Sequence, residues 1–416
     1  MPVSKLFFDA NRLIKKAVKM NLPDEAVRKA LKGRIFSGEI SVVAIGKAAW
    51  TMAKAAYDEL GARIKRGVVI TKYGHSQGAI PGMEIVEAGH PVSDANTIAG
   101  TEKALSLAAS MDEKDELLLL ISGGGSALFE KPLPPLTLDD IAAVNKALLA
   151  SGADIVEINM IRKRLSSVKA GRFALACAPA KILAIVLSDV LGDRLDSIAS
   201  GPAAPDLSTA EDALNVAQKY KLPLGDTISY LAKETPKSLS NVETVIIGSV
   251  RTLCKSAADI AGEMGYKPYI LCSGMNCEAR EAGRLAAALA RQIASGDGAF
   301  HRPCALILGG ETVVHVRGAG KGGRNQEIAL AAAEGIADLK DIAVFSFGSD
   351  GSDGPTDAAG GIVDGSTARK LHVRGMKLLE YLDNNDAYHA LKAVDSLIIT
   401  GPTGTNVNDL TVILAL

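Results

Sequence analysis

The chain has 416 residues, which favours two domains because a single hydrophobic core stops growing at about 250–300 residues. Hydrophobic residues make up 48% and charged residues 22%, a globular balance that argues against disorder. A net charge of −1 and an aromatic content of 4% provide neither a basic field nor stacking surfaces, so we expect no nucleic-acid partner.

Three features indicate a cytoplasmic protein without a membrane partner. Asp9, Asn11 and Arg12 interrupt any apolar stretch at the N-terminus, which argues against a signal peptide. The longest apolar run, Leu117–Ile121, is too short to cross a bilayer. The five cysteines have no C-x-x-C spacing, and we interpret them as buried thiols in a reducing compartment rather than as disulfides or zinc ligands.

One pattern recurs along the chain: a short apolar run ends in glycine, serine or aspartate, and a helical pattern follows. The runs are Ser41–Lys47, Gly67–Gly74, Glu116–Gly125, Lys181–Asp189, Glu243–Ser249, Lys267–Gly274, Cys304–Glu311, Asp341–Asp350 and Asp395–Gly404. Continuous apolar strands that alternate with helices predict an α/β fold with parallel sheets covered on both faces. Ligand-binding loops are then expected at the carboxyl edge of each sheet.

The segment Leu207–Leu239 shows no clear strand, and we predict a domain junction near Pro236. The predicted domains are therefore residues 1–236 and 237–416. The strands ELLLLISGGGSA and CALILGGET are alike, which is weak support for two similar halves.

The first candidate for chemistry is Lys47, which follows an apolar strand and opens a helix. A cation in the first turn of a helix opposes the macrodipole, and a bound anion would reverse that conflict. The alternative is an exposed lysine that extends into water.

The second candidate is a glycine-rich loop that follows the strand LLLLI. Its residues are Ser122, Gly123, Gly124, Gly125 and Ser126. Successive N–H groups in such a loop form an anion nest, and a flexible turn is the alternative.

The third candidate, Gly318–Gly323, matches G-x-G-x-x-G and is predicted to lie between a strand at Thr312–Arg317 and a helix. A nicotinamide-binding turn is one interpretation. We prefer a phosphate loop, because Lys321 and Arg324 add cations that a bound anion would bridge. The binding residues predicted here are Gly320, Lys321, Gly323 and Asn325.

Acidic side chains follow several of the predicted strands. Asp189 and Glu311 each end a strand, and an acid at this position can bind Mg²⁺ or accept a hydroxyl proton. The loop GSDGSDGPTD contributes Asp350, Gly351, Asp353 and Asp357 to the predicted binding site. Neighbouring carboxylates repel each other, so a divalent cation or basic residues are expected nearby, although aspartates also favour turns for their own reasons.

Asn406, Asn408 and Asp409, in GPTGTNVND, are candidate ligand contacts, and an Asn/Asp-rich turn is the plainer alternative. His75 and His90 lie in predicted loops, where a structural role is more common than a catalytic one. The chain contains no Walker A motif and no G-x-S-x-G or H-E-x-x-H motif. If this protein acts on phosphates, it must therefore bind them with a loop other than the Walker A loop.

Eight motifs in matching order carry a family resemblance that covers nearly the whole chain. They are AIGKAA, TKYGH, AGHPVSD, ISGGGSAL, VLSDVLGDRLDSIASGP, GGETVVHVRGAGKGGRNQEIALA, FGSDGSDGPTDAAGG and TGPTGTNVNDL. Together they resemble the type II glycerate kinases, whose C-terminal domain is called MOFRL.

The resemblance implies ATP-dependent phosphorylation of D-glycerate to 2-phosphoglycerate, assisted by Mg²⁺ or another divalent cation. It implies two Rossmann-like three-layer domains with mostly parallel sheets and an active-site cleft between them. Lys47 and Arg324 would be the functional cations, one from each domain. We add Asp189 as a catalytic residue, and Asp189 and Asp350 as the predicted metal ligands.

The predicted partners are glycerate and a nucleotide, and a homo-oligomer is compatible with the sequence. Two alternatives stay open at this point. One is a hydroxypyruvate reductase that uses a nicotinamide cofactor, a label that some relatives carry. The other is a non-catalytic sensor of phosphorylated sugar acids.

Overall fold

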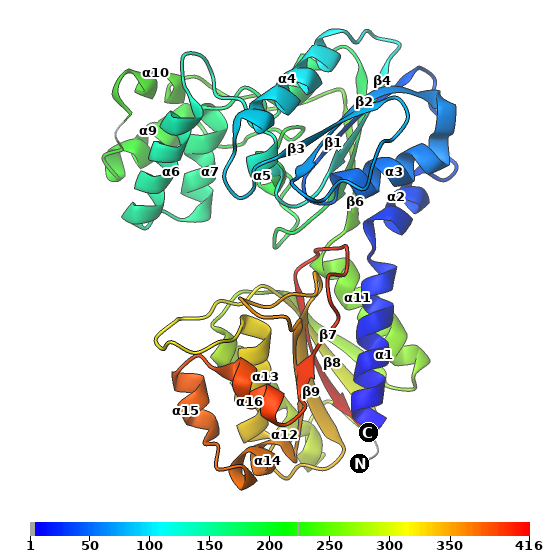
Figure 1. Cartoon of the computed structure of the whole chain (residues 1–416), viewed down its shortest axis with the longest axis vertical. Helices are drawn as coiled ribbons and strands as arrows, with labels where there is room; N and C mark the ends of the chain where they lie inside the picture. Colours follow the sequence, from blue (N-terminus) through cyan, green and yellow to red (C-terminus); the bar gives the residue numbers. More distant parts are fainter. Residues whose placement is uncertain (1–4, 223) are drawn as a thin grey trace. The chain divides into compact units, whose positions relative to one another are not determined.

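The computed structural model describes residues 5–222 and 224–416, and the chain divides into two compact units (Figure 1). The first unit is Pro23–Ile247, and the second combines the described part of Met1–Leu22 with Gly248–Leu416. Each unit is built on a six-stranded sheet with helices packed against it. The predicted α/β fold class is confirmed.

The sheet of the first unit has the strand order β3-β2-β1-β4-β5-β6, which is the order of a doubly wound dinucleotide-binding fold. Its strands are β1 (Ile40–Ile45), β2 (Ile64–Lys72), β3 (Met83–Ala88), β4 (Glu116–Ile121), β5 (Lys181–Leu187) and β6 (Val242–Gly248). The pairings from β3 through to β5 are parallel. The inner strands β1, β4 and β5 are almost wholly buried, as their continuous apolar sequences predict.

The helices of the first unit fall into two groups. Some lie around the sheet: α2 (Pro23–Leu31), α3 (Ala49–Leu60), α4 (Ala95–Ala109), α5 (Gly125–Leu128) and α8 (Arg172–Ala176). The others form a helical layer with its own apolar core: α6 (Leu138–Ser151), α7 (Ile155–Arg164), α9 (Ala210–Lys219) and α10 (Ile228–Leu231). Capping boxes at Thr137, Asp154 and Thr209 start three of these helices by satisfying their first N–H groups.

The sheet of the second unit has the order β11-β10-β9-β12-β8-β7. Its strands are β7 (Lys267–Met275), β8 (Cys304–Gly310), β9 (Ile342–Gly348), β10 (Gly360–Asp364), β11 (Leu397–Ile398) and β12 (Asp409–Ala415). β7 and β8 are parallel, but β12 lies between β8 and β9 and is antiparallel to both. β10 is also antiparallel to its neighbours. This sheet is therefore mixed, which a continuous apolar run cannot reveal because a strand buried on both faces reads alike in either direction.

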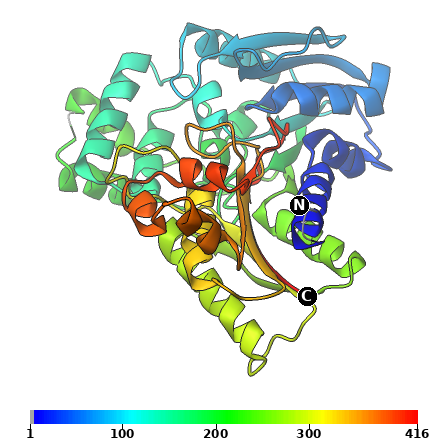
Figure 2. The same ribbon diagram turned by 60° about the horizontal axis from the view of Figure 1, so that its bottom comes forward.

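The helices of the second unit cover both faces of its sheet. They are α1 (Lys5–Met20), α11 (Val250–Glu263), α12 (Ala279–Ser295), α13 (Arg324–Gly335), α14 (Thr367–Val373), α15 (Leu378–Asp383) and α16 (Ala387–Ala393). Figure 1 shows α1 and α11 on one face and α12, α13 and α16 on the other. Figure 2 shows α1 in dark blue beside α11 in green.

The boundary between the units differs from the predicted junction near Pro236. β6 follows Pro236 but belongs to the first sheet, so the boundary lies between Ile247 and Gly248. The N-terminal helix also belongs with the second unit. The hydroxyl of Tyr266 donates to Asp9 at 2.7 Å, and long-range contacts of this kind leave no local signal in the sequence.

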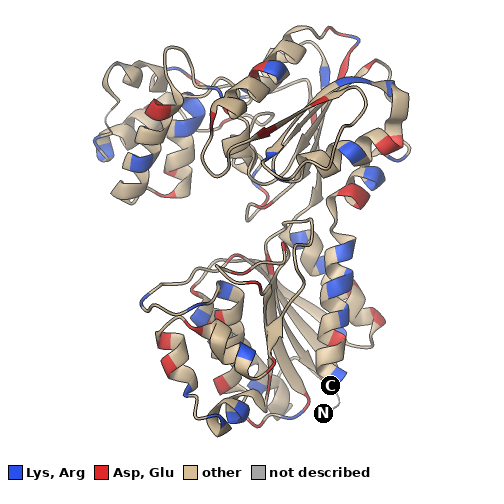
Figure 3. Ribbon diagram, in the orientation of Figure 1, with Lys and Arg blue, Asp and Glu red and all other residues tan. Residues whose placement is uncertain are grey.

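Several other expectations can be compared with the structure. Thr312–Arg317 forms only an isolated bridge at Val313 rather than the predicted strand, and Asp395–Gly404 contains only the short β11. All five cysteines are free, and Cys177, Cys254 and Cys304 are buried. Figure 3 shows acidic and basic residues mixed over both units. Among the described residues, no helix is long and apolar enough to span a membrane.

Candidate functional site

Three of the predicted segments meet at one edge of the first sheet. β1, β4 and β5 are adjacent and parallel, so their carboxyl ends lie together. Lys47 follows β1, the loop Ser122–Ser126 follows β4, and Asp189 follows β5. The chain changes winding direction between β1 and β4, and in open α/β sheets this switch point is where ligands bind. We call these segments the loop cluster.

Hydrogen bonds join the glycine loop to the segment that contains Lys47. The Lys47 N–H donates to the Gly123 carbonyl at 2.8 Å, and the Ala48 N–H donates to Ser122 Oγ at 3.0 Å. Gly124 has φ +86°, and a Cβ there would lie 3.2 Å from Lys47 Cγ. The loop therefore needs glycine both for its backbone conformation and for the close approach of Lys47.

Asp189 lies directly against the same loop. A Cβ on Gly123 would lie 2.1 Å from Asp189 Oδ2, a separation that atoms cannot adopt. Only glycine at position 123 leaves room for the Asp189 carboxylate beside the loop. The structure brings together Lys47, Asp189 and Ser122–Ser126, all of which the sequence analysis selected.

The loop cluster contains donors that the protein itself does not use. Within the described residues, nothing pairs with Lys47 Nζ, and nothing accepts from the N–H groups of Gly123 and Gly124. No side chain caps the N-terminus of α3, which begins two residues after Lys47. One ammonium, two backbone donors and the positive end of a helix dipole therefore favour an anionic ligand.

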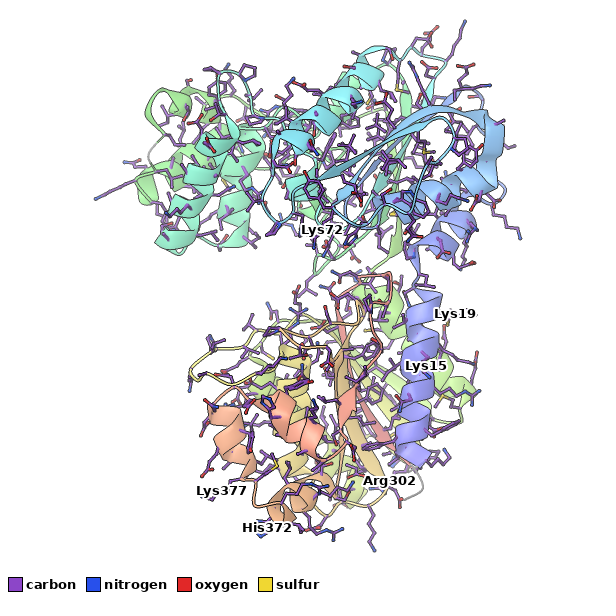
Figure 4. All side chains as sticks on the ribbon, in the orientation of Figure 1. Lys15, Lys19, Lys72, Arg302, His372 and Lys377 are labelled. Atoms are coloured by element: carbon purple, nitrogen blue, oxygen red, sulfur yellow. The ribbon has the colours of Figure 1, made fainter. Side chains whose placement is uncertain are left out.

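Two histidines that the sequence analysis set aside also contact this cluster. His75 Nδ1 lies 3.0 Å from the Lys47 carbonyl, and the His90 ring lies against Gly124. Burial lowers the pKa of His90, and Lys47, Lys72 and His75 lower it further. Lys72, labelled in Figure 4, is at the carboxyl end of β2. The motifs KYGH and AGHP gave the only sequence signal, because spatial proximity to Lys47 is not visible in sequence.

A second group of predicted residues surrounds Arg324, at the start of α13 in the second unit. Arg324 Nη1 donates to Glu311 Oε1 at 2.9 Å, and Nη2 donates to Asp409 Oδ1 at 3.1 Å. Burial acts to lower the pKa of Arg324, but the hydrogen bonding to Asp409 and the negative charges of Asp409 and Glu311 together outweigh it, so the pKa is raised. Asn408 Nδ2 donates to Glu311 Oε2 at 3.1 Å. We call Arg324, Glu311, Asn408 and Asp409 the arginine cluster.

Asp350 lies beside the arginine cluster. A Cβ on Gly348 would lie 3.3 Å from Asp350 Oδ1 and 3.4 Å from Asp409 Oδ1, so both carboxylates approach the same point. Burial raises the pKa of Asp409 to about 6, although Arg324 acts in the opposite direction. Carboxylates thus outnumber the single arginine, a charge balance that favours a further cation.

The loops around the arginine cluster pack closely on each other. Gly351 has φ +85°, and a Cβ there would lie 2.0 Å from the Gly401 carbonyl oxygen. Asn406 Oδ1 accepts from the Asn408 N–H at 3.4 Å, as in an Asn-rich turn. Gly351 and Asn406 are therefore explained by loop geometry.

Three residues predicted to bind ligand, Asp353, Asn325 and Asp357, have hydrogen-bond partners within the protein. Both oxygens of the buried Asp353 accept from the N–H and side-chain amide groups of Asn325 and Gln326, between 2.9 and 3.2 Å. Asn325 Oδ1 in turn accepts from Ser346. Asp353 therefore caps α13 and positions Arg324, which is a structural task. Asp357 is exposed and accepts from the Tyr388 hydroxyl at 2.8 Å.

The loop Gly318–Gly323 differs from its predicted role as a phosphate nest. Its N–H groups through Lys321 donate instead to a neighbouring turn, Asn384–Asp386. The Lys321 ammonium lies 4.7 Å from the centre of the Tyr388 ring. Spacing alone could not show this, because the partners of these donors come from a turn more than sixty residues away.

No group of three or more His, Cys, Asp or Glu side chains is arranged to hold a metal in the part of the chain that the structure describes. The lack of such a group is compatible with Mg²⁺ bound together with a nucleotide. Such an ion needs only one or two protein carboxylates, because water and phosphate oxygens complete its coordination. Asp189 in the loop cluster and Asp350 beside the arginine cluster are the acids that fit.

The fold and these two clusters define an α/β protein whose first sheet has open N–H donors and a lysine ammonium at its switch point. Residues 9–231 match a domain of unknown function (DUF4147), and residues 304–409 match the MOFRL family. The chain is 53% identical to the D-glycerate 2-kinase of Thermotoga maritima, over 96% of each chain. It is 40% identical to the glycerate 2-kinase of Pyrococcus horikoshii, over 96% of this chain and 95% of that protein.

A solved structure gives the same result. The crystal structure of glycerate kinase from Thermotoga maritima superposes with a TM-score of 0.96 at 52% identity and covers 99% of each chain. The chain therefore belongs to the MOFRL family of glycerate 2-kinases.

Proposed function

We propose that this chain transfers a phosphoryl group from ATP to D-glycerate and yields 2-phosphoglycerate. The observation that carries the proposal is the loop cluster: Lys47 without a partner, beside open N–H groups and Asp189 at a topological switch point. Phosphoryl transfer needs positioned positive charge more than covalent catalysis, and this cluster supplies it. The 53% identity to a D-glycerate 2-kinase supports the choice of substrate.

The roles follow from the chemistry of each group. Lys47 neutralises charge on the phosphoryl group as it moves, and the N–H groups of Gly123 and Gly124 bind phosphate oxygens. Asp189, half-buried beside Gly123, orients the glycerate hydroxyl or holds the divalent cation.

Arg324 is assigned to the glycerate carboxylate or to the transferred group, and this role requires it to exchange a carboxylate partner for the ligand. A guanidinium suits either ligand because it donates two parallel hydrogen bonds. Glu311 and Asp409 keep it charged and oriented until then.

A divalent cation belongs to the proposal as the partner of ATP. Asp189 in the first unit or Asp350 in the second would bind it, and the bound ion would neutralise charge on the phosphates. Chelation with EDTA is therefore expected to abolish turnover, and added Mg²⁺ to restore it.

The decisive experiment is phosphorus NMR of the purified protein with Mg-ATP and D-glycerate, beside a sample without glycerate. A new phosphomonoester signal with the coupling of a 2-phosphate is the expected result. A 3-phosphate signal would contradict the product while leaving the kinase in place. Absence of glycerate-dependent ADP would contradict the proposal altogether, and NADPH binding would then be measured to test the reductase alternative.

A further inference from the structure

The segment Arg162–Arg172 in the first unit is rich in basic residues, and several of them are buried. The proposed phosphoryl transfer assigns no role to this segment. Its sequence, RKRLSSVKAGR, holds five cations. The side chains of Lys163, Arg164 and Lys169 are no more than 3% exposed. Because lysine and arginine are almost never fully buried unless they are paired, each must have a local task.

Lys169 uses all three of its N–H donors beneath the glycine loop. Its Nζ donates to the carbonyls of Ser126 and Phe129, each at 2.9 Å, and lies 2.9 Å from Glu130 Oε2. Ser126 is the last residue of the glycine loop and lies in α5, which begins at Gly125. The ammonium therefore fixes the carbonyls at the far end of the loop, and Glu130 compensates its charge.

The backbone next to Lys169 fixes the other half of the loop cluster. The Ala170 N–H donates to the Ser200 carbonyl at 3.1 Å, and the Gly171 N–H donates to the Gly201 carbonyl at 2.7 Å. Ser200 and Gly201 end the segment that begins at Asp189. One short stretch of chain thus contacts both loops that the proposed mechanism needs.

The two loops also contact each other at a strained point. Ala199 and Ser200 have φ values of 51° and 60°, a conformation that residues with a side chain avoid unless surrounding contacts impose it. Ser200 Oγ lies 3.0 Å from Ser126 Oγ, and a Cβ on Gly125 would lie 2.7 Å from Ala199 Cβ. A small displacement at Lys169 would therefore move both the glycine loop and the Asp189 segment.

We propose that Lys169, paired with Glu130, is a positioning residue for phosphoryl transfer, which aligns the N–H groups of the glycine loop with Asp189. This inference rests on the proposed function. Lys169 is fully buried, and its ammonium contacts the glycine loop at Ser126. The N–H groups of the next two residues, Ala170 and Gly171, contact the end of the Asp189 segment. Its effect is expected in the alignment of groups during transfer, where small displacements lower rates strongly.

The test compares variants that separate charge burial from loop position. Lys169→Met alone leaves Glu130 buried and unpaired, so the informative variant is Lys169→Met with Glu130→Gln. The double variant removes both charges and leaves the Ser126 and Phe129 carbonyls without their donor. It also removes the carboxylate whose charge acts on Arg162, and the melting temperature reports that cost. Lys169→Arg keeps the charge and provides a second variant if the double variant does not fold.

Arg164→Met is the matched control. Arg164 is equally buried in the same segment, but its guanidinium bonds to Asp206 and Ser208, away from the glycine loop. Each protein is assayed for kcat and KM with Mg-ATP and D-glycerate, and its melting temperature and folded fraction are measured in parallel.

We expect the double variant and Lys169→Arg to lose about 10- to 100-fold in kcat per folded molecule, with KM for glycerate changed less than about threefold. Arg164→Met should lose melting temperature with little change in kcat. Wild-type kcat in either folded Lys169 variant, or an equal loss in the control, overturns the inference. A wild-type protein that does not phosphorylate glycerate contradicts the proposed function instead, and the inference fails with it.

Discussion

The loop cluster and the arginine cluster differ in how their cations are paired. The Lys47 ammonium has no partner within the described residues, and the N–H groups of Gly123 and Gly124 are open. Arg324 donates to two carboxylates, and Asp353 occupies the first N–H groups of its helix. One cluster leaves positive charge for a ligand, whereas the other is neutralised by the protein before any ligand binds.

Because of this difference, we expect Lys47 to contribute to ligand binding and catalysis but little to stability, and Arg324 to contribute to both. A half-buried lysine without a partner contributes little to folding, so its removal should mainly affect ligand chemistry. A paired arginine is different, because its removal leaves carboxylates close together and without compensation. Variants of the two clusters should therefore change activity and stability in different proportions, and the predictions below test that distinction.

The largest effect is expected for Lys47→Met, which keeps the stem beside Gly124 but removes the charge. We expect kcat to fall about 1,000-fold, since a donor that stabilises transition-state charge contributes about that much. The melting temperature should stay near that of the wild type. ADP release and a thermal melt measure the two quantities.

Lys72→Met is the control for Lys47, because Lys72 ends β2 at the same edge of the sheet. It should retain activity within about threefold, as expected when only a longer-range charge is removed. Near-normal turnover of Lys47→Met, or an equal loss in Lys72→Met, would rule out the assigned role.

Arg324→Ala should affect both quantities. We expect kcat to fall about 100-fold and the free energy of unfolding to fall by about 1–3 kcal/mol, a range reduced because the Arg324 side chain is partly exposed to screening solvent. Arg324→Lys should recover much of the stability but little of the activity, because an ammonium cannot make the bidentate contact. Denaturant unfolding and steady-state kinetics provide the values, and an Arg324→Ala protein as stable as the wild type would contradict the contrast between the clusters.

Asp353→Ala should mainly lower stability. It removes the acceptor for the N–H groups of Asn325 and Gln326, and we expect a loss of about 2 kcal/mol. Activity per folded molecule should fall less than about tenfold, because Asp353 acts through α13 rather than on the ligand. A loss of activity as large as that of Lys47→Met, without destabilisation, would return Asp353 to the ligand site.

The smallest effect concerns His90 and pH. In the folded protein the pKa of His90 is below its ordinary value of 6.5. At pH values between the lowered pKa and 6.5, the unfolded chain therefore binds a proton at His90 that the folded chain does not. The contribution of His90 to stability is complete above pH 6.5 and is lost as the pH falls through the lowered pKa. His90→Asn should therefore lose less melting temperature than the wild type between about pH 7.5 and about pH 5. Parallel slopes for the two proteins would show that His90 is not desolvated as the structure has it.

The residues at the loop cluster could be selected from the sequence because each follows an apolar strand of a parallel sheet. The carboxyl ends of such strands share one edge, so Lys47, Ser122–Ser126 and Asp189 had to lie near one another once β1, β4 and β5 were neighbours. The same reasoning was weaker in the second unit. There β12 enters antiparallel between β8 and β9, and it brings Asp409 to Arg324 from the end of the chain.

The sequence alone determined the α/β class, most of the apolar strands, the family and most residues at the loop cluster. These follow from local patterns: buried strands are continuously apolar, and glycine marks backbone that must approach other atoms closely. Only the tertiary structure decided that α1 joins the second unit, that Asp353 caps a helix, and that the donors of Gly318–Lys321 are occupied. It also placed Lys169 beneath the glycine loop. Each of these depends on a partner distant in sequence, and the identity of a buried polar group's partner is set by packing rather than by its neighbours in the chain.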